Sequence, residues 1–177
     1  PLSKFDKLQL VIDYSVAISI TLIINILFIL GEIPTWIYTT FILGFFMGAS
    51  FEYIQPRLGW VCYYKCITYK LAPMRSMWII HSVWDSLIFH IILYLSYLIW
   101  GQRLYHKFIP GASLFMGFLG MAQEIFVECY QTLWYYRSTK FNPTWAIIRG
   151  RNMTLQQWHW SILPPLYYII VINYLYP

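Results

Sequence analysis

Charged side chains are scarce in this chain of 177 residues: Asp, Glu, Lys and Arg make up 11% of it, and only 7 residues are acidic. Soluble domains of ordinary composition carry about 25% charged residues. The chain is 59% hydrophobic and 21% aromatic. Long apolar runs with aromatic ends are typical of helical membrane proteins. The sequence therefore predicts an all-α, multi-pass membrane protein that forms a single domain over residues 1–177.

Cysteine is also rare, with Cys62, Cys66 and Cys129 as its three copies. Cys62 and Cys66 stand four residues apart, which differs from the CxxC of redox and zinc sites. This excludes a disulfide framework and favours unpaired thiols that act as small hydrophobic residues. The sequence also lacks Gly-rich phosphate loops, nucleophile elbows and metalloprotease helices, which argues against ATP-driven, serine-hydrolase and zinc-protease chemistry.

Five apolar stretches are long enough to cross a membrane. Breakers such as Pro34, Pro56 and Gly101 separate them. The fifth stretch carries Pro164-Pro165, which must kink or break its helix. The predicted spans are residues 8–30, 35–55, 74–100, 110–137 and 155–174.

Basic residues are distributed unequally around these five spans. Arg103 and Lys107 lie on one side, and the other ten of the 12 Lys and Arg residues lie on the side of the N-terminus. Because cytoplasmic loops are enriched in Lys and Arg, the N-terminus is predicted to be cytoplasmic. The net charge of +5 is spread over the connecting loops. Membrane lipids, and not nucleic acid, are therefore the expected acidic partners.

Asp13 lies near the start of the first predicted span, and four further acidic residues fall inside the other spans: Glu52, Asp85, Glu124 and Glu128. His81 precedes Asp85 by one helical turn, so the two share a helix face, as Glu124 and Glu128 do. An ionisable group in hydrocarbon costs about a few kcal/mol or more, and it usually faces a bundle interior and serves a function. These groups are expected in the cytoplasmic half, below an almost purely apolar outer half. The pattern predicts a pocket that opens from the cytoplasmic leaflet.

Two such pairs can perform general acid–base catalysis, because a desolvated carboxyl stays protonated while its partner accepts a proton. Glu52 and Asp85 are the expected proton donors or electrostatic stabilisers, and His81, Glu124 and Glu128 the expected base or relay. We expect at least one of Glu124 and Glu128 to be protonated at neutral pH, and Asp85 to be ionised only where it meets His81. The alternative is a structural network of interhelical hydrogen bonds.

A metal is the other chemistry that such residues serve. Di-iron bundles use Glu-x-x-His at a spacing of three residues. The intramembrane spacings here are His-x-x-x-Asp and Glu-x-x-x-Glu, and His90 lies off the face of His81. The sequence therefore predicts neither a metal site nor a cofactor.

Aromatic residues lie at the depth of the carboxylates. Aromatic faces stabilise cations, including carbocations that develop on a substrate, although ordinary packing explains the same positions. The residues expected to contact a hydrophobic substrate are Trp84, Tyr130, Trp134, Trp158 and His159.

The stretch from Glu52 to Tyr63 reads Glu-Tyr-Ile-Gln-Pro-Arg-Leu-Gly-Trp-Val-Cys-Tyr. It is similar to a stretch of small integral-membrane carotenoid and terpenoid cyclases and carotenoid hydratases, in which a membrane Glu precedes a Gly and an aromatic cluster. The resemblance implies proton-initiated attack on a polyene or epoxide, with Glu52 as the position that carries over. The Pro-Leu-Glu-Glu stretch of one such family is absent. An interfacial aromatic belt after a helix end is the alternative.

These observations favour an integral-membrane enzyme that isomerises, cyclises or hydrates an isoprenoid, sterol or polyene lipid. One alternative is a proton-coupled carrier that uses the same carboxylates as a relay, although inverted repeats are not visible. Another is a non-catalytic subunit of a larger membrane assembly, since 16 Tyr and 9 Trp suit a chain buried among other proteins or one that holds lipid or pigment. Its partners would be other proteins or further copies of this chain.

Overall fold

The structure is a computed structural model that describes residues 4–58, 61–62, 74–130, 136–137, 144–148 and 151–177. Helices form most of it. In chain order they are α1 (Lys4–Ile29), α2 (Thr35–Leu58), α4 (Met74–Trp100), α5 (Arg103–His106), α6 (Pro110–Tyr130), α7 (Leu155–Trp160), α8 (Leu163–Ile170) and the π-helix η1 (Val171–Leu175).

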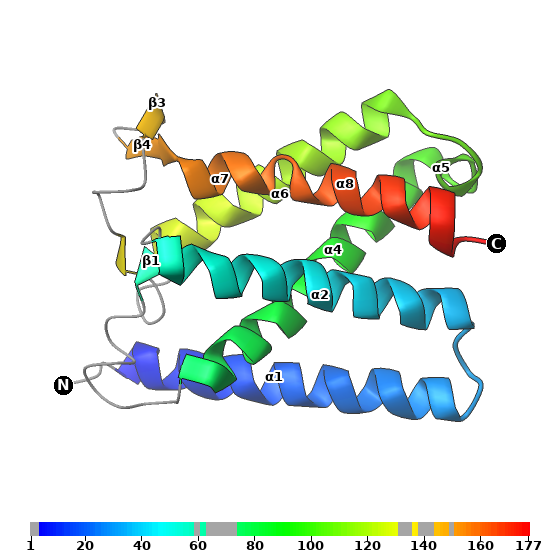
Figure 1. The fold of residues 1–177 in the computed structure, drawn as a ribbon, viewed down its shortest axis with the longest axis horizontal. Helices are drawn as coiled ribbons and strands as arrows, with labels where there is room; N and C mark the ends of the chain where they lie inside the picture. The colour runs from blue at the N-terminus through cyan, green and yellow to red at the C-terminus, as the bar shows by residue number, and fades with distance from the viewer. Residues whose placement is uncertain (1–3, 59–60, 63–73, 131–135, 138–143, 149–150) are drawn as a thin grey trace.

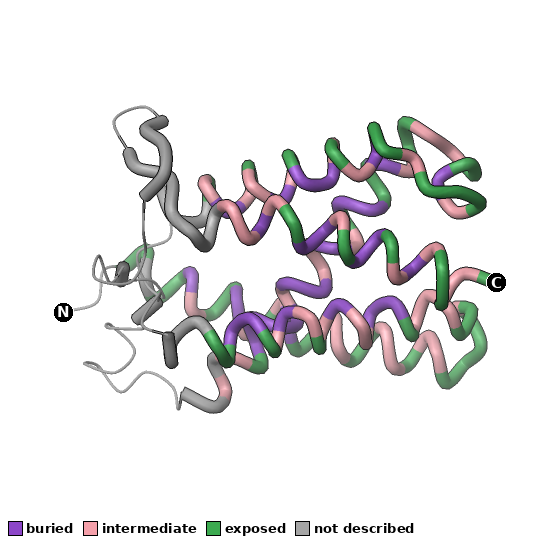
Figure 2. Tube along the Cα trace, turned by 45° about the horizontal axis from the view of Figure 1, so that its top comes forward, coloured by how far each residue is buried: buried purple, intermediate pink, exposed green. Residues whose placement is uncertain are grey.

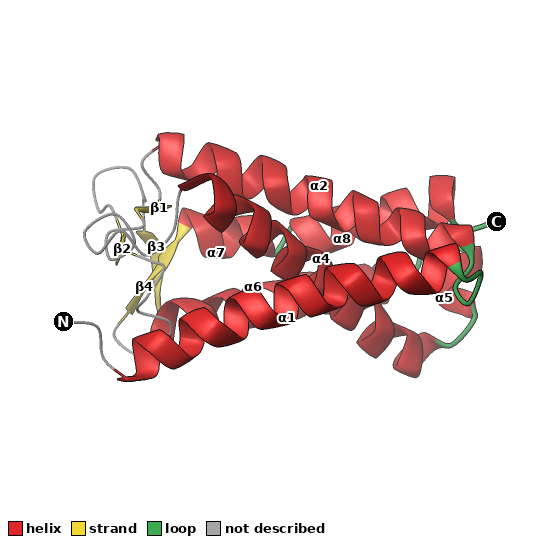
Figure 3. Cartoon of the chain, turned by 90° about the horizontal axis from the view of Figure 1, so that it is seen from below, coloured by secondary structure: helices red, strands yellow, loops and turns green. Residues whose placement is uncertain are grey.

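Four short strands accompany the helices. The strand β1 (Val61–Cys62) pairs antiparallel with β2 (Tyr136–Arg137), and β3 (Thr144–Ile148) pairs antiparallel with β4 (Arg151–Thr154). The strands gather at the end of the molecule where α1 begins (Figure 3). The start of α1 and the end of η1 lie at opposite ends of the long axis (Figure 1). The all-α prediction is thus confirmed for the bundle, with two short antiparallel strand pairs at one end.

The third predicted span agrees with α4 at both ends, whereas the fourth was predicted too long. Its helix ends at Tyr130, and Tyr136–Arg137 instead pairs with β1. The sequence pattern did not mark the helix end, because a short apolar and aromatic run is compatible with either a helix or a strand.

The fifth predicted span is broken where its prolines lie. The helix α7 ends at Trp160, and α8 begins at Leu163 with Pro164 and Pro165 in its first turn. Proline has no N–H to donate and is tolerated at a helix start but not in a helix interior. The predicted break is therefore confirmed.

Buried and exposed positions alternate along the helices of the bundle (Figure 2). Many of the exposed residues are large and apolar, whereas several charged residues are buried. Leu22, Leu98 and Leu114 are 57%, 61% and 77% exposed, whereas Asp85 and Glu124 are 6% and 2% exposed. Large exposed apolar surfaces mark contact with a membrane or with a partner.

Three helices are long and apolar enough to cross a membrane. Their apolar stretches are Lys7–Ile29 in α1, Thr35–Ile54 in α2 and Trp78–Trp100 in α4. Together with the apolar exterior, these stretches support a protein that crosses a membrane more than once.

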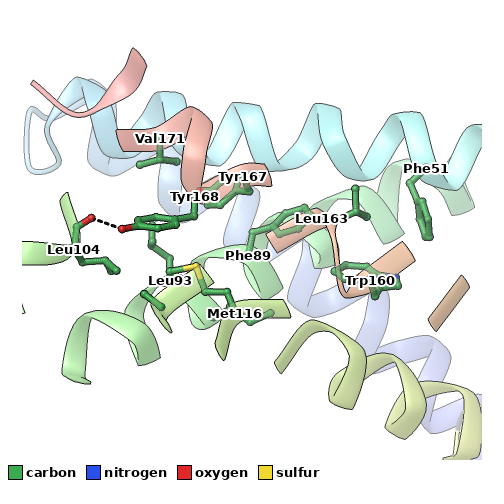
Figure 4. Packing of buried hydrophobic residues seen from close by; sticks show 12 residues of the cluster. Phe51, Phe89, Leu93, Leu104, Met116, Trp160, Leu163, Tyr167, Tyr168 and Val171 are labelled. Carbon is green, nitrogen blue, oxygen red and sulfur yellow. Dashed lines mark hydrogen bonds between the residues drawn. The ribbon is translucent and has the colours of Figure 1, made fainter. Parts of the chain in front are cut away.

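A cluster of buried hydrophobic residues joins α4, α6 and α8 (Figure 4). Phe89 stacks on Trp160 and Tyr167 at centroid distances of 5.5 and 5.0 Å. The hydroxyl of Tyr168 donates a hydrogen bond of 2.9 Å to the carbonyl oxygen of Leu104, which ties α5 to α8. This core fixes α8 and, through it, the position of α7.

Candidate active site

A buried histidine and a buried glutamate meet between α2 and α4. The Nδ1 atom of His81 lies 3.4 Å from Oε2 of Glu52, and the two residues are 6% and 2% exposed. The ring nitrogen can donate to a carboxylate or accept a proton from a neutral carboxyl. The two side chains can therefore share one proton between them.

Asp85 lies one helical turn beyond His81 and is buried as well. Its Oδ2 atom finds no hydrogen-bond partner among the residues that the structure describes. The charges of Glu52 and Glu124 both act on the Asp85 carboxyl. Helices α2, α4 and α6 thus each contribute one buried acidic residue, and Glu52 and Glu124 lie close enough to Asp85 for their charges to act on it.

Glycines on α2 allow this close approach. A Cβ on Gly48 would lie 2.7 Å from Oδ2 of Asp85, and one on Gly44 would lie 2.8 Å from Oγ of Ser86. Real Cβ atoms do not come so close, so only glycine lets the α2 backbone reach α4 here. Gly44, Gly48 and Glu52 follow each other at four-residue spacing and share one helix face. The small-xxx-small pattern that joins membrane helices therefore also inserts Glu52 into the bundle.

The same arrangement recurs on α6. A Cβ on Gly120 would collide with the backbone carbonyl oxygen of Trp160 in α7. Glu124 follows Gly120 by one helical turn and is 2% exposed. In both helices a glycine that allows close packing is followed, one turn later, by a buried glutamate.

Helix α1 is held against α4 by polar contacts near the carboxyls. The Nε1 atom of Trp84 donates to the backbone oxygen of Asp13 at 3.1 Å, and the hydroxyls of Tyr14 and Ser76 lie 3.0 Å apart. The Trp84 indole packs between α1 and α4. Its expected contact with a substrate stays a prediction.

Aromatic residues close in sequence to Glu52 and Asp85 contact the rings of α7. The ring of His159 lies 4.5 Å from that of Phe51, the residue before Glu52, and Trp160 contacts Phe51 edge-on at 5.8 Å. His159 and Trp158 are half-buried on α7. Phe89, one turn after Asp85, stacks on Trp160.

Three other predicted site residues cannot be placed in this cluster. Glu128 and Tyr130 belong to the last turn of α6, but their side chains lie outside the described part. Trp134 falls outside the described residues altogether. Among the described residues, no group of three His, Cys, Asp or Glu side chains could hold a metal ion.

His90 belongs to a second buried polar network. Its Nδ1 donates to the backbone oxygen of Ser86 at 2.8 Å, and its Nε2 lies 3.0 Å from Oγ1 of Thr40 and 3.4 Å from the hydroxyl of Tyr167. The Tyr167 hydroxyl also lies 3.1 Å from the carbonyl oxygen of Thr40, to which it can donate. The network links α2, α4 and α8.

This network corrects one sequence expectation, that the half of the bundle beyond the carboxyls is almost purely apolar. The four-residue spacing of Ser86 and His90 in an apolar helix was its visible signal. Thr40 and Tyr167 are distant in sequence from His90, so their contribution depends on how the helices pack.

Comparison with protein-family models, with curated proteins and with solved structures finds no match to this chain. The geometry of the site therefore carries the functional argument.

Proposed function

We propose that this protein is an integral-membrane enzyme that moves protons on an apolar isoprenoid, sterol or polyene lipid. The observation that carries the proposal is that two buried acidic groups have different hydrogen-bond surroundings. Glu52 and His81 can share a proton at 3.4 Å, while Oδ2 of Asp85 has no hydrogen-bond partner among the described residues. Groups whose surroundings differ in this way are suited to separate acid and base roles.

Asp85 is the acid in this scheme. A carboxylate without a donor is costly to bury, so the neutral, proton-carrying form is favoured. Asp85 protonates one alkene carbon of the lipid, and the Glu52–His81 pair removes a proton from a carbon beside the cation. One proton enters and one leaves, so isomerisation needs no co-reactant. Cyclisation adds attack by a second alkene of the same lipid before the proton is lost, and hydration adds a water molecule.

A five-span arrangement accompanies this proposal. Besides the three apolar helices, α6 has 21 residues, which at about 1.5 Å per residue suffices for the hydrocarbon core. The segment from α7 to η1 is of similar length, and Leu166 and Ile169 are exposed on it. Protease-sensitive tags at the two termini of the protein in sealed vesicles test the topology. Equal accessibility of both tags would reject an odd number of spans.

The resemblance of the stretch that begins at Glu52 to membrane cyclases and hydratases supports the same chemistry. In those proteins a membrane glutamate takes part in proton-initiated attack on a polyene or epoxide. In this chain Glu52 is buried at the site and contacts His81.

Deuterium incorporation tests the function directly. The purified protein, incubated in D₂O with a panel of polyprenyl, sterol and carotenoid lipids, should yield products that carry carbon-bound deuterium. Asp85→Asn, Glu52→Gln and His81→Gln should each lower turnover by about 100-fold or more. Glu32→Gln is the matched control, because Glu32 is exposed in the turn between α1 and α2. Full activity in all three site variants would reject the assignment.

A proton-coupled carrier is the second candidate, and the His90 network favours it. This network supplies polar groups in the part of the bundle beyond the carboxyls. A proton could not pass through that part if only apolar side chains filled it. Proton flux into vesicles under a pH gradient, abolished by His90→Phe, would support the carrier. Flux equal to that of protein-free vesicles would exclude it.

A further inference from the structure

Among the described residues, none donates a hydrogen bond to Oδ2 of Asp85, and the charges that act on this carboxyl are those of other acids. On its own helix, the Nδ1 atom of His81 faces Glu52 at 3.4 Å. From α2 and α6, the charges that act on Asp85 belong to Glu52 and Glu124. On α1, Asp13 is a further buried acid, and its backbone oxygen is bonded to Trp84. The group that would satisfy Oδ2 of Asp85 in its ionised form is therefore a donor that carries positive charge.

We propose that this site binds the protonated amine of a lipophilic molecule, with an ammonium N–H donating to Oδ2 of Asp85. A proton alone would neutralise the carboxyl but would leave it without a partner, whereas an ammonium group supplies both charge and donor. Phe51 precedes Glu52 in sequence and Phe89 follows Asp85 by one helical turn, and both rings contact Trp160. Aromatic faces stabilise cations. The ligand is lipophilic because the site lies inside a bundle with an apolar exterior.

This inference deepens the proposed function and rests on it in one respect. The carbocation of the proposed reaction and an ammonium group carry the same charge, so the amine should also block turnover. Binding of the amine does not itself require turnover. Amine binding without activity on any lipid would therefore reject the proposed function alone, and turnover without amine selectivity would reject this inference alone.

The experiment compares two probes of equal length, N,N-dimethyldodecylamine and dodecyl methyl ether. Their affinities for the full chain in nanodiscs are measured by calorimetry at neutral pH, where the free amine is protonated. The wild-type protein should bind the amine at least about tenfold more tightly than the ether, since a hydrogen bond between charged groups is worth that much. Asp85→Asn should reduce the preference to about twofold or less, and Glu32→Gln should keep it. An unchanged preference in Asp85→Asn overturns the inference.

A third probe keeps the test decisive if Asp85→Asn does not fold. Dodecyltrimethylammonium carries the charge but has no N–H, so the wild-type protein should bind it more weakly than the tertiary amine. Equal affinity for the two ammonium probes would overturn the hydrogen bond to Asp85, and a wild-type protein that did not distinguish amine from ether would overturn the site.

Discussion

Asp85 of α4 lies in close contact with Gly48 of α2. A Cβ atom on residue 48 would lie 2.7 Å from Oδ2 of Asp85 and 2.6 Å from the Cβ atom of Asp85. The contact places a buried acid directly on a backbone. The position of α2 therefore limits the orientation of the Asp85 carboxyl, because there is no space left between the α2 backbone and this side chain. The glycine is thus a positioning residue for the acid.

Gly48→Ala should separate α2 from α4 and displace the Asp85 carboxyl. Overpacking of this kind costs about 1–3 kcal/mol of stability, and we expect turnover to fall more than substrate affinity. Denaturant titration and steady-state kinetics measure the two effects. Gly111→Ala is the matched control, because its nearest contact would be Trp100 at an ordinary 3.8 Å. Equal stability of the two variants would contradict the close packing.

The contact between Glu52 and His81 predicts energetic coupling. Either Glu52→Gln or His81→Gln alone leaves the remaining partner buried without its counterpart, so each should destabilise the protein. The double variant should cost less than the sum of the single variants by about 0.5–3 kcal/mol, the range found for residues in contact. Unfolding of the four proteins completes the cycle. Additive losses would mean that the two side chains do not interact.

Sequence reasoning reached the α4 limits, the break at the prolines and the buried state of Glu52, His81 and Asp85. These follow from local chemistry: apolar length, the missing N–H of proline and the cost of placing charge in lipid. The partners of each group did not follow, because they depend on helix packing. The four-residue spacing of His81 and Asp85 suggested that these two side chains interact. In the structure, however, Nδ1 of His81 contacts Glu52.

The glycines show why this packing was hidden. Gly44, Gly48 and Glu52 were visible as a four-residue series, but the helix that they face cannot be deduced from their spacing. Likewise, Thr40 and Tyr167 meet His90 across 50 and 77 residues of sequence. A pattern within one helix indicates a face, whereas only the assembled bundle identifies the neighbour.

The hydroxyl of Tyr167 predicts a measurable link between α8 and α2. Tyr167→Phe removes the hydrogen bond to the carbonyl oxygen of Thr40, which should lower the free energy of unfolding by about 1 kcal/mol or more, since a buried acceptor loses its donor. Turnover should change little, because Tyr167 contacts Thr40 and His90 and is none of the proposed acid–base groups. Tyr174→Phe is the control, since Tyr174 is 81% exposed. A Tyr167→Phe protein as stable as this control would show that the contact adds nothing.

Tyr105 predicts how the stability depends on pH. Burial, together with the nearby phenols of Tyr97 and Tyr176, raises the pKa of Tyr105 from 10.0 to about 12. Tyr105 belongs to α5, the short helix between α4 and α6. Its ring stacks on that of Tyr176 at a centroid distance of 4.8 Å. Because the unfolded chain loses this proton first, the unfolded state binds fewer protons above pH 10, and stability must fall as pH rises from about 10 toward 12.

Tyr105→Phe isolates this contribution. The variant cannot ionise at residue 105, so its free energy of unfolding should decline less steeply between about pH 10 and 12 than that of the wild-type protein. Denaturant unfolding of both proteins at a series of pH values measures the slopes, and the difference between the two curves should be constant below about pH 9, where the phenol is neutral in both states. Parallel curves across the whole range would mean that the folded protein does not hold Tyr105 in its neutral form.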